Sequence, residues 1–165
     1  MPDEIEYGRK EWKKDSDAAY AEAECRVAHV LETGETYLFL SDLYALKRLP
    51  PTLAECVQLE RLHIGDSYGP DGYSYSYPGT HELEGWSVLS SLKSLTELVL
   101  TYTNIADISP LEGATALQSL NLWNTQVADI SPLEGATALQ TLDLAGTQVA
   151  DISPLEGATA LQSLN

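Results

Sequence analysis

The stretch LQSLNLWNTQVADISPLEGATA occupies residues 117–138, and residues 139–160 repeat it as LQTLDLAGTQVADISPLEGATA. The two copies are identical at 18 of 22 positions. A period of about 20 to 50 residues is typical of repeat architectures, in which each unit buries its apolar face against its neighbours. The apolar side chains recur at matching positions in the two copies: Leu117, Leu120, Leu122, Val127, Ile130 and Leu133, then Leu139, Leu142, Leu144, Val149, Ile152 and Leu155.

Each copy predicts its own local structure. The motif LxxLxL predicts a short strand that sends its leucines inward and exposes the alternate residues, so that stacked coils form a parallel sheet. Ser109–Glu112 has the pattern of a capping box, with Ser as N-cap of a short helical turn, and so have Ser131–Glu134 and Ser153–Glu156. We expect a glycine to end each turn (Gly113, Gly135 and Gly157). The regular spacing of Asp107, Asp129 and Asp151 favours side-chain-to-backbone bonds over metal ligation.

The chain before these repeats predicts a helix and a first, irregular coil. Residues 16–32 have helical periodicity, with Ser16 as N-cap and Gly34 as the stop, and their apolar stripe is Tyr20, Ala23, Val27, Val30 and Leu31. We expect this helix to cover the end of the solenoid, since an end coil otherwise exposes a core face. The first coil takes its apolar positions from Leu38, Leu40, Leu43, Leu46, Leu49 and Leu53, and Pro50-Pro51 opens its outer turn.

One repeat is longer than the others. Leu59 and Leu95 lie 36 residues apart, 14 more than the regular period, and the excess falls on YGPDGYSYSYPGT at residues 68–80. Gly, Pro, Asp and Ser predict a loop. Its tyrosines (Tyr68, Tyr73, Tyr75 and Tyr77) allow two interpretations. They form an adaptable recognition loop, for which Tyr offers a large contact area at low entropy cost, or they pack on the solenoid edge as part of a linker-like bulge.

The motif LxxLxLxxTxVxDIsPLxxxT resembles the 22-residue bacterial class of leucine-rich repeats, similar to those of internalins and of the leucine-rich regulator of protein phosphatase 1. The resemblance implies an α/β leucine-rich-repeat solenoid, or horseshoe, with a parallel concave sheet, short helical turns on the convex side and an N-terminal capping helix. The opening AxAxCRVAHVLETGxTYLFLSDLYALKRLPP resembles the entry into the repeat regions of bacterial Roco proteins, where a Ras-like GTPase follows. The expected segments are a tail and capping helix at 1–34, and repeats over 35–165 divided at 35–58, 59–94, 95–116, 117–138, 139–160 and a partial 161–165.

Composition and missing motifs exclude several classes of function. The net charge is −16, and no Lys or Arg follows Lys93, which argues against nucleic acid and against anionic membrane surfaces. Without an apolar signal core or a transmembrane run we expect a cytoplasmic protein, with Cys25 and Cys56 as small buried or half-buried reduced thiols. No nucleophile elbow, Walker loop, Rossmann glycine pattern or metalloprotease helix occurs, and the spacing of His63, His81, Asp66 and Asp71 matches no zinc or EF-hand pattern. We therefore predict no enzyme activity, cofactor or metal.

The two near-identical copies differ only at Ser119/Thr141, Asn121/Asp143, Trp123/Ala145 and Asn124/Gly146, all at expected exposed positions of the strand or its exit. One explanation is that packing and turn geometry constrain the other positions, so that unselected substitutions accumulate only on this surface. A recognition surface is the other, and we favour it because convex pairs such as Gln126/Gln148 are unchanged. The predicted partner-binding residues are those of the concave face and the Tyr-rich loop: His63, Asp66, Tyr68, Tyr73, Tyr75, Tyr77, Thr101, Tyr102, Asn121, Trp123, Asn124 and Asp143.

These features predict a non-enzymatic module that binds a protein or peptide on its concave face. The acidic charge favours a basic or neutral partner. Two alternatives stay open: the sensor or regulatory region of a larger signalling enzyme of the Roco type, truncated at its C-terminus, and a structural or oligomerising solenoid that stacks through 161–165. A last coil without a cap would expose apolar groups and a strand edge, so we expect a C-terminal continuation or a stacked partner there.

Overall fold

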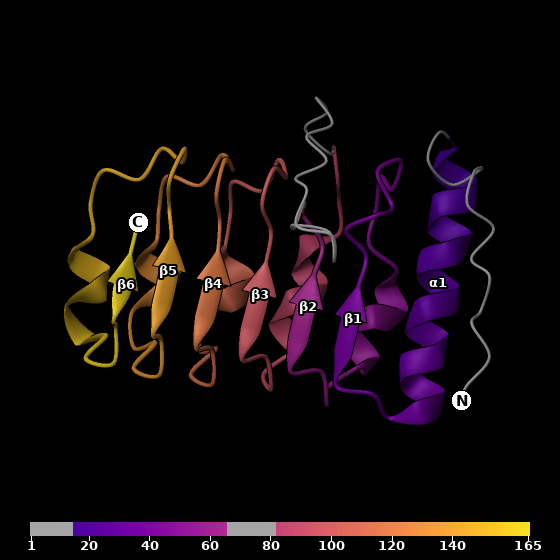
Figure 1. Cartoon of the computed structure of the whole chain (residues 1–165), viewed down its shortest axis with the longest axis horizontal. Coiled ribbons are helices and arrows are strands. Elements are labelled where there is room, and N and C mark those ends of the chain that lie inside the picture. Colours follow the sequence, from indigo (N-terminus) through magenta and orange to yellow (C-terminus); the bar gives the residue numbers. More distant parts are fainter. Residues whose placement is uncertain (1–14, 66–81) are drawn as a thin grey trace.

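The computed structural model describes residues 15–65 and 82–165. Its six parallel strands form one sheet in chain order: β1 (Tyr37–Phe39), β2 (Arg61–His63), β3 (Glu97–Val99), β4 (Ser119–Asn121), β5 (Thr141–Asp143) and β6 (Ser163–Leu164). Helix α1 (Ser16–Thr33) lies at the β1 end (Figure 1). Five 3-10 turns form a second layer behind the sheet: η1 (Pro51–Glu55), η2 (Trp86–Ser91), η3 (Ser109–Leu111), η4 (Ser131–Leu133) and η5 (Ser153–Gly157). The predicted solenoid architecture is confirmed.

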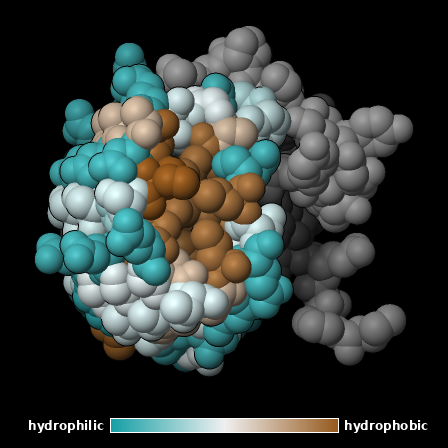
Figure 2. Space-filling model, turned by 90° about the vertical axis from the view of Figure 1, so that its left-hand side faces the viewer, coloured by the Kyte–Doolittle hydropathy of each residue, from teal (hydrophilic) through white to brown (hydrophobic). Residues whose placement is uncertain are grey.

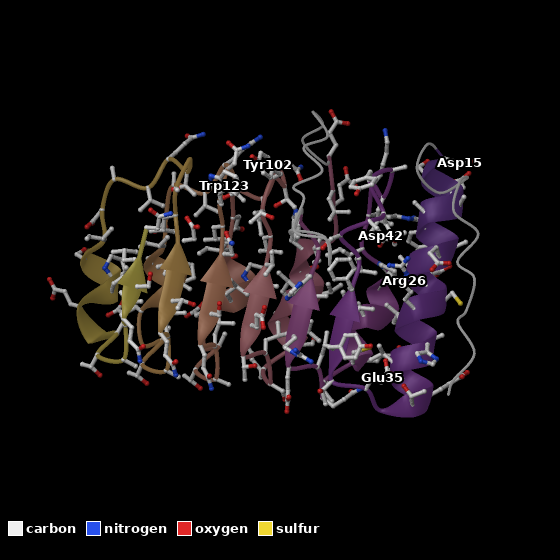
Figure 3. The ribbon with its side chains drawn as sticks, in the orientation of Figure 1. Asp15, Arg26, Glu35, Asp42, Tyr102 and Trp123 are labelled. Carbon is white, nitrogen blue, oxygen red and sulfur yellow. The ribbon has the colours of Figure 1, made fainter. Side chains whose placement is uncertain are left out.

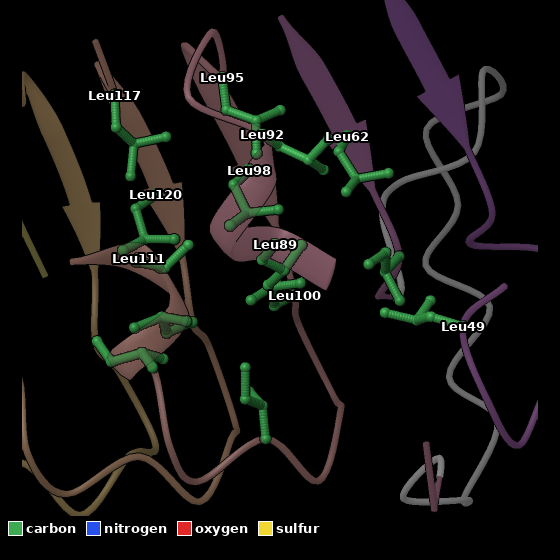
Figure 4. Close-up of a cluster of buried hydrophobic side chains, with 14 of the residues drawn as sticks. Leu49, Leu62, Leu89, Leu92, Leu95, Leu98, Leu100, Leu111, Leu117 and Leu120 are labelled. Atoms are coloured by element: carbon green, nitrogen blue, oxygen red, sulfur yellow. The ribbon is translucent and has the colours of Figure 1, made fainter. Parts of the chain in front are cut away.

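The middle residue of each strand points into the core and sets the register of the sheet. Leu98 pairs with Leu120, and Leu120 pairs with Leu142. These side chains are 0 to 2% exposed and belong to one continuous buried cluster. Figure 4 shows part of it, where Leu98 and Leu120 lie beside Leu89 and Leu111 of the outer turns. Leu62 pairs with Leu98 although 36 residues separate them, so the long repeat keeps the register that the sequence predicted. Its insertion, at 68–80, lies outside the described residues.

Helix α1 differs in two details from its prediction. Asp15, not Ser16, is the N-cap: its carboxylate accepts the N–H groups of Asp17 and Ala18 at 2.8 and 3.3 Å. Gly34 ends the helix as predicted, in a left-handed conformation with φ 73°. The buried stripe consists of Ala19, Ala23, Val27 and Val30, whereas Leu31 is 38% exposed. The stripe is therefore rotated toward Ala19, because two alanines let the helix lie close against the first coil.

Arg26 ties α1 to the chain that follows β1 (Figure 3). Its guanidinium donates to both carboxylate oxygens of Asp42, at 2.6 and 2.9 Å, to Glu22 at 2.8 Å and to the Phe39 carbonyl at 2.8 Å. Burial lowers the pKa of Arg26, but the bonds to Asp42 and Glu22 outweigh it, so the pKa lies above its ordinary value. The charged, bidentate pair fixes both the position and the orientation of the helix.

The outer turns are held by aspartate and not by the predicted serine caps. The N-cap positions of η3, η4 and η5 are isoleucines, and each Ser is the first residue of its turn. The carboxylates of Asp107, Asp129 and Asp151 accept the N–H groups of Ser109, Ser131 and Ser153 at 2.8, 2.8 and 2.9 Å. The capping-box prediction is wrong because each serine lies inside its turn, where its N–H donates to the aspartate two residues earlier. The predicted side-chain-to-backbone role of the aspartates is confirmed.

Glycine ends two of these turns as expected. Gly113 and Gly135 follow η3 and η4 with φ angles of 73° and 84°, in the left-handed region that favours glycine. Gly157 is instead the last residue of η5 and has no positive φ. The expectation for the two cysteines holds for Cys56, which is buried, and its burial beside Glu55 raises the pKa of the thiol. It is wrong for Cys25, which is exposed on α1.

The last coil exposes side chains whose equivalents are buried one coil earlier. Ile152 is 54% exposed against 1% for Ile130, and Leu164 is 44% exposed against 2% for Leu142. Figure 2 shows the resulting apolar patch, ringed by polar side chains, at this end of the molecule. The predicted exposure of apolar groups in the last coil is confirmed. Within 15–65 and 82–165, no helix has the length and apolar character needed to cross a membrane.

Gly65 allows the chain leaving β2 to lie directly on the next coil. A Cβ atom at this position would come within 2.0 Å of the Thr101 carbonyl oxygen, a backbone atom that cannot move aside. We expect Gly65→Ala to lower the free energy of unfolding by about 2 kcal/mol or more, as overpacking of a fixed site does. Gly157→Ala is the matched control, because nothing lies within 4 Å of its Cβ position. Urea denaturation of both variants checks this, and equal midpoints would contradict it.

The aspartate-held turns make stability depend on pH in a defined direction. The N–H and O–H groups of Ser109 hold the pKa of Asp107 below its ordinary value, and Ser153 does the same for Asp151. A lowered folded-state pKa stabilises the fold above the unfolded-state value of about 3.9, and this stability is lost as the pH falls through the folded-state pKa. We expect the thermal midpoint of Asp107→Ala to be lower than wild type at pH 7 and to fall less between pH 7 and pH 3. Glu134→Ala removes an equal charge whose side chain makes no described hydrogen bond, and it should keep the wild-type slope.

Candidate functional site

The strand side chains that point away from the core form one continuous surface, termed here the open face, which corresponds to the predicted concave face. It has two rows that run across the strands. The first row is Tyr37, Arg61, Glu97, Ser119, Thr141 and Ser163, and the second is Phe39, His63, Val99, Asn121 and Asp143. Arg61 is the one Lys or Arg on the six strands.

Three of the four differences between the tandem copies exchange residues that do the same structural task. The hydroxyl of Thr141 donates to that of Ser119 at 2.9 Å, so either residue can take part in a ladder across the strands. The side chain of Asn121 accepts the N–H of Trp123 at 3.0 Å, and that of Asp143 accepts the N–H of Ala145 at 2.9 Å. These two residues therefore fix the exit of the strand in the same way.

The third exchange lies at a position where each regular coil takes a left-handed backbone conformation. Asn124 has φ 55° and Gly146 has φ 72°, and both residue types tolerate this region. The equivalent residue one coil earlier is Tyr102, with φ 57°. A bulky side chain in this region is strained, at a cost of about 1–2 kcal/mol. Asn124 and Gly146 are thus residue types suited to the left-handed backbone at this position, and Tyr102 is not.

Tyr102 and Trp123 meet at the edge of the open face where the chain leaves β3 and β4 (Figure 3). Their ring centroids are 4.9 Å apart with an interplanar angle of 64°, an edge-to-face arrangement. Both side chains are half-buried, so part of each ring is accessible. The N–H of Tyr102 donates to the Trp123 carbonyl at 3.0 Å, which holds the two residues in register beyond the strands. Trp123 is the remaining difference between the copies, and Ala145 replaces it without any shared structural task.

A second group of large side chains lies on β1 and β2. Tyr37 is 51% exposed and Phe39 is 38% exposed. The guanidinium carbon of Arg61 lies 5.6 Å from the centroid of the Tyr37 ring, and the His63 ring lies 5.8 Å from that of Phe39. His63 also contacts Glu97 of β3, with 2.8 Å between Nε2 and the carboxylate. Each aromatic residue of β1 therefore faces a nitrogen-rich side chain of β2.

The structure brings together part of the predicted binding set. His63, Tyr102, Asn121, Trp123, Asn124 and Asp143 all lie on or beside the open face, while Asp66, Tyr68, Tyr73, Tyr75 and Tyr77 lie outside the described residues. Thr101 was expected on the accessible surface, but it is 2% exposed because Gly65 packs against its backbone. Sequence comparison missed Tyr37, Phe39 and Arg61, since it weighed the differences between near-identical copies and the first two coils have no such copy. Their alternation with the inward Leu38 and Leu62 was the available signal.

No group of three or more His, Cys, Asp or Glu side chains is placed to hold a metal ion in the part of the chain that the structure describes. A shallow acidic depression beside η3 and η4 is lined by carboxylates that include Asp107 and Asp129. Both of these are already bonded to serine N–H and O–H groups. Aromatic rings and a guanidinium, which the open face carries, are groups enriched in protein interfaces.

Comparison with known proteins is consistent with this architecture. The family model for leucine-rich repeats (2 copies) matches residues 93–135 and, in a second alignment, 115–157. A search of curated proteins finds no match. An internalin of Listeria monocytogenes is 21% identical with a TM-score of 0.47; the alignment covers 92% of this chain but only 58% of the internalin.

Two further solved structures have higher TM-scores. A leucine-rich-repeat protein of Leptospira interrogans is 18% identical, with a TM-score of 0.55 and coverage of 76% of this chain and 32% of that one. The plant peptide hormone receptor RGFR1 in complex with RGF2 is 16% identical, with a TM-score of 0.52 and coverage of 76% and 21%. At these identities the likeness concerns the fold alone. Residues 93–157 are leucine-rich repeats, and the described chain folds as a leucine-rich-repeat solenoid with an N-terminal helix.

Proposed function

We propose that this chain is a binding module that holds a protein or peptide on its open face, with Trp123 and Tyr102 as its aromatic anchor. Stacked repeats create extended surfaces that serve binding, and their rigidity lowers the entropy lost on association. The plant receptor among the similar folds is described in complex with RGF2, which makes a peptide ligand a reasonable choice for this chain as well. The total charge of −16 favours partners that are basic or neutral over most of their surface.

The strained tyrosine carries this proposal. At its position Asn124 and Gly146 satisfy the left-handed backbone without cost, yet the chain has Tyr102 with φ 57°. Strain of this kind persists where it has a use, because folding alone would select the easier residue. The edge-to-face contact with Trp123 recovers about 0.5–1.5 kcal/mol, so the pair is close to neutral for stability. A half-buried Trp–Tyr pair is also the composition of interface hot spots.

Two variants separate binding from folding. Tyr102→Asn installs the residue found at the equivalent position 124, and Trp123→Ala installs the residue found at 145. We expect Tyr102→Asn to unfold within about 1 kcal/mol of wild type, since strain relief offsets the lost ring contact. We expect Trp123→Ala to be destabilised by about 1–3 kcal/mol, because it loses the ring contact and apolar burial while Tyr102 stays strained, and to remain folded by circular dichroism. We expect each variant to bind at least about tenfold more weakly, as loss of an anchor side chain does. The probe is a set of peptides of about 12 residues, selected on the wild-type chain from a random library, with affinities measured by calorimetry.

The matched control is Thr141→Ser, which changes the open face at a site where Ser119 already provides the same hydroxyl. Wild-type affinity is expected for it. Unchanged affinity in both Tyr102→Asn and Trp123→Ala would remove the anchor from the proposal, and a library without any binder would remove the proposal itself.

A further inference from the structure

Arg61 is a cation on the open face that forms no ion pair with a carboxylate of residues 15–65 or 82–165. Its neighbour across the β2–β3 ladder is Glu97, the carboxylate in position to neutralise it. Glu97 contacts His63 instead, at 2.8 Å, and within the described ranges no carboxylate forms an ion pair with Arg61. An exposed arginine without such a partner is unexpected in a chain with 25 acidic and 9 basic side chains. Among the described residues, this arrangement leaves the guanidinium without a carboxylate partner.

The guanidinium also has an aromatic neighbour. It lies over the Tyr37 ring, with 5.6 Å between its central carbon and the ring centroid, which is within the range of a cation–π contact. This contact does not use the guanidinium N–H groups as hydrogen-bond donors, and these match a carboxylate with two parallel hydrogen bonds.

Apolar surface lies directly beside this cation. Phe39 is two residues from Tyr37 on the same side of β1 and is 38% exposed, with its ring held 5.8 Å from that of His63. Among the described side chains of the open face, Tyr37 and Phe39 are the exposed large hydrophobic ones. A ligand that fits has a carboxylate for Arg61 and an apolar side chain next to it for Phe39.

The two groups of aromatic residues lie within reach of one peptide. Arg61 and Trp123 are two strands apart, and Trp123 is four residues beyond the position level with Arg61. At ~4.8 Å between strands and ~3.3 Å per residue, these offsets correspond to a separation of roughly 16 Å, or about five residues of extended chain. A single extended segment can therefore place one side chain at Trp123 and a carboxylate at Arg61.

We propose that Arg61, Tyr37 and Phe39 form a subsite for a carboxylate with an adjacent apolar side chain, at one end of the peptide that the Tyr102–Trp123 pair anchors. This inference rests on the proposed function and names the chemical groups at the end of the peptide that lies away from the Tyr102–Trp123 pair. The carboxylate is that of an Asp or Glu side chain or the free C-terminus of the peptide; both present the same two oxygens. The partner is then locally acidic at this end, within a segment that is otherwise neutral or basic.

The test compares the selected peptides of about 12 residues in three forms: with a free C-terminus, with an amidated C-terminus, and with Asp and Glu changed to Asn and Gln. On the wild-type chain, we expect removal of the recognised carboxylate to weaken binding about tenfold or more. The form that loses affinity tells which source the carboxylate has. On Arg61→Gln the same removal should have no further effect, because the two groups act as one pair in a double-mutant cycle. Phe39→Ala should weaken all forms alike.

Lys47→Gln is the control, because it removes the same charge from an exposed side chain that makes no described hydrogen bond or ion pair. With Lys47→Gln, removal of the carboxylate should weaken peptide binding as much as it does with the wild-type chain. The subsite is overturned if the selected peptides carry no carboxylate, or if its removal weakens wild type and Arg61→Gln equally. In that event the proposed function survives if Trp123→Ala still loses affinity. A library without any binder to the wild-type chain overturns both.

Discussion

The fold depends on the stacking of one leucine per strand against its equivalents in the neighbouring coils. No coil can bury Leu120 alone, because its strand is three residues long and its outer turn is a short 3-10 helix. Burial requires Leu98 on one side and Leu142 on the other, held by the parallel ladder. A buried leucine contributes about 2 kcal/mol, so each coil adds stability only where a neighbour covers it. The last coil shows the same rule from its open side, where Ile152 and Leu164 are exposed.

The same constraint explains why an insertion can leave the repeat without disturbing it. The strand, the buried leucine and the outer turn must keep their spacing, but the chain between β2 and η2 need only return to the next coil. Loop closure becomes costlier only slowly with length. Leu62 and Leu98 consequently stay paired. Gly65 marks the point of departure, where the backbone passes too close to Thr101 for any side chain.

Most of the fold could be predicted from the sequence because its determinants repeat, and the errors occurred where local geometry decides between equivalent groups. The 22-residue repeat predicted the register and the buried leucines, and the helical spacing of residues 16–32 predicted the helix that covers the first coil. It could not predict that Asp15 would cap α1 in place of Ser16, or that Asp107 would hold η3 in place of a serine N-cap. Serine and aspartate both accept backbone N–H groups, and the choice depends on which oxygen lies nearer. Leu31 was misplaced for a related reason, since a small helix rotation moves a side chain at the stripe's edge into solvent.

Less of the candidate site than of the fold could be predicted from the sequence. Comparison of the two copies treated their four differences as one signal, whereas the structure shows that three of them exchange residues with the same structural role. Ser119/Thr141, Asn121/Asp143 and Asn124/Gly146 each preserve a hydroxyl, an acceptor or a left-handed backbone. Constraint explains these three exchanges, so the support for recognition narrows to Trp123 and to Tyr102 in the coil before it. Tyr37 and Arg61 lie in coils without a near-identical copy, so only their alternation with the inward Leu38 and Leu62 could have indicated their positions.

A rigid repeat scaffold is what allows residues such as Tyr102 to be unfavourable for folding. Its N–H bonds to the Trp123 carbonyl, and the next residue bonds back to Leu100, so the strained conformation is imposed from both sides. The leucine ladder beneath is unaffected by which side chain stands there, because Asn124 and Gly146 occupy the same backbone. Stability therefore resides in the inward leucines and the aspartate-held turns, while the open face can carry a strained residue or a charge that has no ion pair within the described residues. The features of this face that folding does not explain are Tyr102, Trp123 and Arg61, and they lie within the reach of one short peptide.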